Sequence, residues 1–155
     1  MLRILLAVHI LAAIIFVGNI ITAAFWKVRA DRSGNLEAIA LSTRAVLLAD
    51  FAFTGPGILA VLGTGIAMAG ITGWERFQEP WLSLSFILFV VTGIIWLAAL
   101  LPLQFRMARL ARQSAARGSL DPAYTRSSRL WAIFGGVATL LPIVILFLMV
   151  LKPAM

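Results

Sequence analysis

Residues 4–26 read ILLAVHILAAIIFVGNIITAAFW and contain one ionisable side chain, that of His9. A helix needs about 20 mostly apolar residues to cross roughly 30 Å of hydrocarbon. Further runs of this kind follow at residues 45–71, 81–105 and 129–151. Because backbone groups find no water inside a bilayer, such runs are expected to be helical. The sequence therefore predicts an all-α, integral membrane four-helix bundle, with residues 1–155 as a single domain.

The composition supports a membrane protein. Of the 155 residues, 62% are hydrophobic and only 12% are charged, which is too apolar for an ordinary soluble domain. The 13 Lys and Arg residues outnumber the 6 Asp and Glu residues, but they lie beside the ends of the apolar runs, as topology signals do. We therefore expect the lipid bilayer as a partner and no nucleic acid. The chain has no Cys, which excludes disulfides, thiolate metal sites and a Cys nucleophile.

The loop charges predict the orientation of the bundle. Most basic residues lie in or beside the first and third connections: Lys27, Arg29, Arg32, Arg44, Arg106, Arg109, Arg112, Arg117, Arg126 and Arg129. Basic loops remain in the cytoplasm, so both termini are expected on the non-cytoplasmic side. The first apolar run is longer than a signal-peptide core and precedes basic residues, so we expect it to be retained. The basic loops can also bind an anionic lipid or a cytoplasmic partner.

Local signals predict where the helices begin and end. Ser33-Gly34-Asn35 is typical of a turn in which Asn35 caps a helix that begins at Leu36. Gly118 is expected to close the third helix, and Asp121-Pro122 to cap and begin the fourth. The second and third helices are thus expected to extend beyond the membrane.

Gly55-Pro56-Gly57 interrupts the second run near its middle. Proline removes an amide donor and its ring clashes with the preceding turn, while the glycines soften the backbone. The sequence predicts a kinked second helix, with a bend or partial unwinding at Pro56. Carbonyl groups freed at this depth must face protein, water or a ligand.

Asp50 is the acidic residue of the second run, and Thr54 lies one turn later on the same face. This polar stripe can line an ion or proton path. Alternatively, Asp50 can form a structural ion pair with Arg44 or another basic residue, because the membrane surface is only about two turns away. We favour the ion pair.

His9 is the second ionisable candidate. An imidazole at this depth can ligate haem iron or copper, relay a proton, or form a hydrogen bond to a neighbouring helix. Trp96 is the one tryptophan deep within a run, so its indole N–H needs a partner or lies beside a ligand. Asn19 is expected to connect helices by a hydrogen bond.

Several segments resemble a known family. They are AFWKVRADRSG at residues 24–34, VLLADF at 46–51 with FTGP at 53–56, and LW at 130–131 followed by LMVLKP at 148–153. They are similar to a bacterial family of predicted four-helix integral membrane proteins of unknown function, domain of unknown function 2269. The resemblance implies a multi-pass protein of the bacterial cytoplasmic (inner) membrane.

That family is in turn distantly similar to copper-resistance membrane proteins and to the haem-using membrane protoporphyrinogen oxidase. In those proteins a histidine of the first helix lies in a Leu-His-Ile-like context, and the matching stretch here is Val8-His9-Ile10. The likeness implies haem b or copper at His9.

Three functions remain open. The first is a haem- or metal-binding redox protein that uses His9, with a second ligand from Met68, another donor or a second subunit, since a single His excludes bis-histidine ligation in one monomer. The second is a small transporter or ion-handling protein that uses Asp50 and the kinked helix. Because four helices leave little room for a pathway, this hypothesis includes a homo-oligomer. The third is a non-catalytic scaffold. We favour the first, and no enzyme activity follows from the residues.

Overall fold

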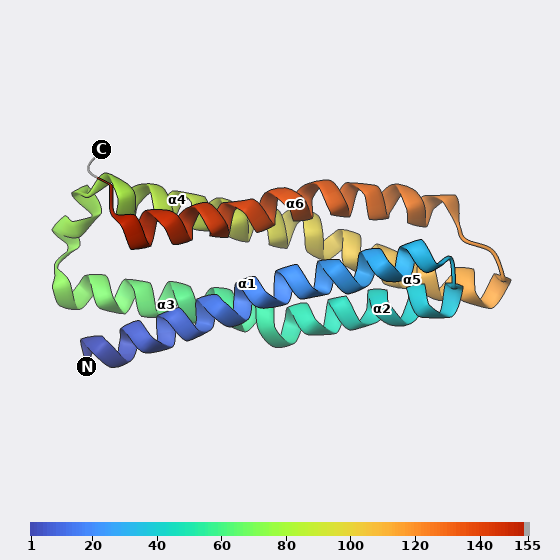
Figure 1. Cartoon of the computed structure of the whole chain (residues 1–155), viewed down its shortest axis with the longest axis horizontal. Coiled ribbons are helices and arrows are strands. Elements are labelled where there is room, and N and C mark those ends of the chain that lie inside the picture. Colours follow the sequence, from blue (N-terminus) through green and yellow to red (C-terminus); the bar gives the residue numbers. More distant parts are fainter. Residues whose placement is uncertain (154–155) are drawn as a thin grey trace.

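The computed structural model describes residues 1–153, which form four long helices (Figure 1). Their bounds are Leu2–Ser33, Leu36–Thr72, Pro80–Arg117 and Pro122–Leu151. Each helix is long and apolar enough to cross a membrane, and each contains one of the predicted runs. The expected all-α membrane bundle is therefore confirmed. Figure 1 shows the N-terminus and the end of α6 at the same end of the bundle.

The second and third long helices are each divided by a π-helical turn. The chain consists of α1 (Leu2–Ser33), α2 (Leu36–Ala49), the π-helical turn η1 (Asp50–Thr54), α3 (Gly55–Thr72), the 3₁₀ turn η2 (Trp74–Gln78), α4 (Pro80–Ile95), the π-helical turn η3 (Trp96–Leu100), α5 (Leu101–Arg117) and α6 (Pro122–Leu151).

Many large apolar side chains lie on the outer surface, and several polar side chains are buried. Large apolar residues such as Ile4, Leu59 and Leu140 are 70%, 70% and 63% exposed. The buried set includes polar and charged residues: Lys27, Thr43, Asp50, Thr54, Ser85, Thr92, Gln104, Ser114 and Ser127. A soluble monomer rarely exposes contiguous apolar surface on this scale. The outer surface therefore suits lipid tails, and the chain is an integral membrane protein.

Each helix changes its packing partner along the bundle. Near the termini, α1 packs on α3 and α4 packs on α6, whereas α2 packs on α5 near the basic connections. The buried apolar core lies mostly in this second half and comprises Ile39, Val46, Leu100, Met107, Ala111, Tyr124, Trp131 and Ala138. Contact between α1 and α6 is much less extensive than between the main pairs. This leaves space between those two helices.

The predicted helix ends are confirmed by their caps. Asn35 Oδ1 accepts the backbone N–H groups of Glu37 and Ala38 at 3.0 and 3.1 Å. Asp121 Oδ1 accepts the N–H of Ala123 at 2.8 Å. Gly34 and Gly118 adopt left-handed conformations, with φ values of 67° and 73°, that close the preceding helices. As expected, α2 and α5 extend beyond the predicted spans.

The predicted interruption of the second helix is a π-helical turn, without unwinding of the chain. The N–H of Gly55 donates to the carbonyl of Asp50, five residues earlier, and α3 continues regularly through Pro56. A wider turn relieves the clash between a proline ring and the turn before it. Figure 1 shows α2 and α3 displaced from one another at this point.

The third helix repeats this arrangement. The N–H of Leu101 donates to the carbonyl of Trp96 in η3, and Pro102 follows directly. In both helices the proline lies six positions after the first residue of the π-helical turn. The two turns therefore share a local cause, although the chain shows no wider sequence repeat.

The close approach of α1 and α3 depends on Gly57. A Cβ atom at Gly57 would lie 2.9 Å from Cβ of Phe16, whereas one at Gly63 on the same helix would meet nothing within 4 Å. Real Cβ contacts are longer than the first of these distances, so an added methyl group would force the helices apart.

We predict that Gly57→Ala lowers the free energy of unfolding by about 1–3 kcal/mol, because overpacking displaces α1. Gly63→Ala is the matched control and should change it by less than about 0.5 kcal/mol. Unfolding by dodecyl sulfate in mixed micelles, followed by circular dichroism, measures both. Equal effects of the two substitutions would contradict the close contact.

Candidate functional site

The carboxyl group of Asp50 is buried at the centre of the bundle, with 5% of the residue exposed. Its Oδ1 accepts hydrogen bonds from Thr54 Oγ1 at 2.7 Å and Asn19 Nδ2 at 3.2 Å. Its Oδ2 accepts from Gln104 Nε2 at 2.6 Å and Trp96 Nε1 at 3.1 Å. The donors come from the first, second and third long helices. Each oxygen thus accepts two hydrogen bonds, and the carboxyl group joins three helices.

Both π-helical turns contribute to this centre. Asp50 is the first residue of η1 and Trp96 is the first residue of η3. A Cβ atom at Gly55 would lie 3.5 Å from the Trp96 ring, so the glycine leaves space for the indole beside the carboxyl group. π-Helical turns in α-helices often mark functional sites. Here they bring an acidic and an aromatic side chain into contact.

The favoured ion pair between Asp50 and Arg44 is wrong. Within residues 1–153, no basic side chain lies within 4.0 Å of the Asp50 carboxyl group, and Arg44 is exposed. The two residues are six positions apart, which places them on different faces of the helix. Neutral donors replace the cation that we had expected.

A cavity of about 480 Å³ adjoins this centre and extends between α1 and α6. Asp50, Thr54, Trp96 and Gln104 contribute to its wall, and most of the remaining lining is apolar. From α1 the lining includes Phe16, Ile20, Ala23, Ala24 and Val28, and from α6 it includes Trp131, Ala132, Gly135, Gly136, Ala138, Thr139 and Leu140. The residues that line this cavity all belong to one chain.

Two buried polar atoms in the residues that line this cavity have no hydrogen-bond partner within residues 1–153. They are Gln104 Oε1 and Trp131 Nε1, and the two residues are 2% and 6% exposed. One atom is an acceptor and the other is a donor. Buried polar groups are normally paired, because leaving one unpaired costs about 1–3 kcal/mol. Both atoms are enclosed by protein and do not face the open space of the cavity.

A second polar cluster connects α1 and α6 nearer the basic end of the bundle. Lys27 is 2% exposed, and its Nζ lies 2.6 Å from Asp31 Oδ2 and also contacts the Ser128 hydroxyl. Asp31 further accepts from Tyr124 at 2.6 Å and from Ser128 at 2.8 Å. The ammonium group lies 5.0 Å from the centre of the Trp131 ring. Lys27, which the sequence suggested to be a loop charge, is therefore a buried residue paired with Asp31.

His9 lies apart from the cavity, on the interface of α1 with α3. Its Nδ1 is 2.8 Å from Thr64 Oγ1, and a Cβ atom at Gly65 would be 3.5 Å from its ring. The Thr64 hydroxyl also donates to the carbonyl of Ala60 at 2.5 Å, and a proton on Nδ1 of His9 would let the hydroxyl oxygen accept from it. Within residues 1–153 there is no group of three or more His, Cys, Asp and Glu side chains arranged to hold a metal. Haem or copper at His9 stays a prediction.

Sequence reasoning missed Gln104, whereas the interhelical hydrogen bond expected of Asn19 is confirmed. Trp96 was expected to need a partner, and Asp50 is that partner. Gln104 lies near the end of the third predicted span, where a polar residue is unremarkable in a sequence. Its spacing of eight positions from Trp96, about two helical turns, was the available signal.

We predict that Asp50→Leu lowers the free energy of unfolding by more than about 3 kcal/mol, because four hydrogen-bond donors, two of them on the buried residues Thr54 and Gln104, lose this acceptor. Arg44→Gln should change it by less than about 0.5 kcal/mol, since Arg44 is exposed. Unfolding by dodecyl sulfate in mixed micelles compares the two variants. Destabilisation of similar size by Arg44→Gln would restore the ion pair.

We also predict that His9→Phe and Thr64→Val each cost about 0.5–2 kcal/mol of stability and that the double variant costs less than their sum, because both remove one contact. Additive costs would show that the contact between His9 and Thr64 contributes nothing to stability. An absorption spectrum and metal analysis of the same samples test the cofactor separately. A Soret band or copper content lost with His9→Phe would establish His9 as a ligand.

Comparison with known proteins places the chain in a family. A search of curated proteins and a search of solved structures found no significant match. Residues 3–153 match the family model described as "Predicted integral membrane protein (DUF2269)". The match spans almost the whole chain and includes Asp50, Trp96, Gln104 and Trp131. The chain therefore belongs to this family of predicted integral membrane proteins.

Proposed function

We propose that the chain is a small ligand-binding membrane protein of the transporter or ion-handling class, with its binding site in the cavity between α1 and α6. The observation that carries the proposal is the cavity of about 480 Å³ itself, whose largely apolar wall includes the acidic residue Asp50.

The charges around the cavity favour a neutral or cationic ligand. Asp50 lines the cavity, and its hydrogen-bond partners are neutral. Lys27, the buried cation nearby, is already paired with Asp31. An anion would meet the unbalanced carboxyl group in a region of low dielectric constant, where like charges repel strongly. A protonated amine would be attracted to it.

Size and lining indicate a small, mostly apolar ligand. Binding cavities for small molecules typically have volumes of about 300–1,000 Å³ and combine apolar walls with a few polar groups. The cavity of about 480 Å³ fits that description. We therefore assign it to an amphipathic amine.

The proposal requires one chain for binding and leaves room for an oligomer in transport. We place the protein in the bacterial cytoplasmic membrane with its basic end in the cytoplasm, on the strength of the loop charges. The sequence suggested Asp50, Thr54 and Pro56 as the residues of a transporter or ion-handling protein. Asp50 and Thr54 line the cavity, and Pro56 accompanies the π-helical turn. No observation favours the redox function in the same way.

We predict that phenylethanolamine, which carries an ammonium group, a hydroxyl group and a phenyl ring, binds the purified protein in calorimetric titrations. Gly136→Leu should weaken binding at least about tenfold, a cost of about 1.4 kcal/mol, because Gly136 lines the cavity and an added Cβ would enter open space. Gly93→Leu is the matched control: Gly93 also has space for a Cβ but does not line the cavity.

The neutral analogue phenylethanol tests the role of charge. Asp50→Asn should weaken binding of the amine more than binding of the alcohol, because the substitution removes the charge and keeps the shape. Equal binding of the amine to wild type and to Gly136→Leu would sink the proposed site. Uptake of the amine into proteoliposomes then separates a transporter from a protein that only binds.

A further inference from the structure

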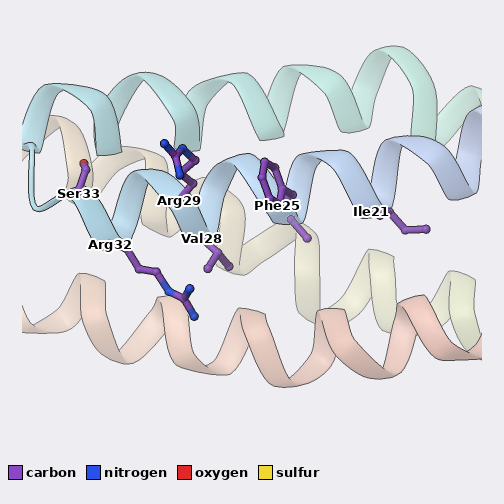
Figure 2. Close-up of a pocket in the computed structure, with 7 residues that line it drawn as sticks. Ile21, Phe25, Val28, Arg29, Arg32 and Ser33 are labelled. Carbon is purple, nitrogen blue, oxygen red and sulfur yellow. The ribbon is translucent and has the colours of Figure 1, made fainter.

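A groove on the surface of α1 lies beside the cavity at the basic end of the bundle (Figure 2). Its volume is about 650 Å³, and it is lined by Ile21, Ala24, Phe25, Val28, Arg29, Arg32 and Ser33. The apolar residues come first along α1 and the polar residues follow. The groove therefore passes from an apolar end, within the predicted span, to a cationic end at the membrane surface.

The groove and the cavity share part of their walls. Ala24 and Val28 line both. In Figure 2, Val28 and Arg32 extend from α1 toward α6, while Arg29 extends toward α2, so the two arginines border the groove from its two sides. The groove thus adjoins the side of the cavity between α1 and α6, and the two arginines flank it.

The arginines are available to an external anion. Arg29 and Arg32 are exposed, and within residues 1–153 no carboxylate oxygen lies within 4.0 Å of either guanidinium group. The acidic residue of this segment, Asp31, is already bound to Lys27, Tyr124 and Ser128. Trp26, which is 62% exposed, lies at the same level, where tryptophan prefers the interface between lipid and water.

We propose that this groove binds an anionic phospholipid of the leaflet at the basic end. Arg29 and Arg32 hold its phosphate group, to which guanidinium groups bind in a bidentate manner. One acyl chain lies along Ile21, Phe25 and Val28, which are 48%, 60% and 38% exposed. A soluble phosphate would use the arginines and leave this apolar strip uncovered, so the combination indicates a lipid.

The proposal does not depend on the ligand assigned to the cavity. It gives the arginines of the first connection a defined partner, in place of a general attraction to the membrane. Because the groove adjoins the cavity at Ala24 and Val28, the bound acyl chain would also cover this side of the cavity.

Native mass spectrometry of the full chain, released from detergent micelles, tests the proposal. The probes are phosphatidylglycerol and phosphatidylcholine with identical acyl chains, and glycerol phosphate as the soluble source of the same phosphate group. Wild type should retain phosphatidylglycerol in preference to phosphatidylcholine, and it should not retain glycerol phosphate. Retention of glycerol phosphate, or equal retention of both lipids, would overturn the lipid assignment.

Two double variants locate the site. Arg29→Gln with Arg32→Gln should weaken retention of phosphatidylglycerol about tenfold. Arg109→Gln with Arg112→Gln is the matched control, because it removes the same charge from another exposed pair with the same spacing, on α5, and it should change retention less than twofold. Equal losses in both double variants would show a general charge effect and overturn the site. Phe25→Ser should weaken phosphatidylglycerol binding through the acyl chain, and its failure to do so would contradict the proposed position of that chain.

Discussion

A carboxyl group inside a hydrocarbon layer must find its hydrogen-bond donors within the protein, because lipid tails offer none. Asp50 meets this requirement through Asn19, Thr54, Trp96 and Gln104. Three of the four long helices supply these donors, so the position of one side chain fixes the relative placement of three helices. The fourth, α6, lies across the cavity, and its Trp131 N–H group has no hydrogen-bond partner among residues 1–153. The hydrogen bonds of Asp50 thus account for the arrangement of the first three helices and for the cavity that remains beside α6.

The second buried charge, that of Lys27, is stabilised in a different way. Lys27 is neutralised by Asp31 and lies near the faces of Tyr124 and Trp131, with Nζ 5.4 and 5.0 Å from the two ring centres. Both charged clusters therefore border the space between α1 and α6, one through neutral donors and the other through an ion pair. Trp131 belongs to both environments, since its ring meets Lys27 and its residue lines the cavity.

The sequence predicted the helices well and the centre only in part. Long apolar runs and the caps at Asn35 and Asp121 are local properties, and they determined the helices and their ends. The partners of Asp50 depend on how helices distant in the chain are rotated, which no local pattern records. Arg44 was therefore a reasonable partner because it is close to Asp50 in the sequence. It was the wrong partner because it lies on a different face of the helix. Lys27 was misjudged for a related reason, because a basic residue beside an apolar run usually lies at the surface, and only the packing of α6 buries it.

The π-helical turns have a consequence for the relation between sequence and structure. Each residue of an α-helix advances by about 100°, and a π-helical turn holds one residue more than the α-helical turn it replaces. The turns η1 and η3 therefore each insert one extra residue, which rotates the second half of the long helix relative to the first half. The half before each turn and the half after it can face different neighbours, as α2 faces α5 and α3 faces α1. The structure therefore depends on the spacing between Asp50 and Pro56 and on that between Trp96 and Pro102. Deleting one residue from either segment would leave the composition almost unchanged, but the side chains of the polar centre would no longer be aligned.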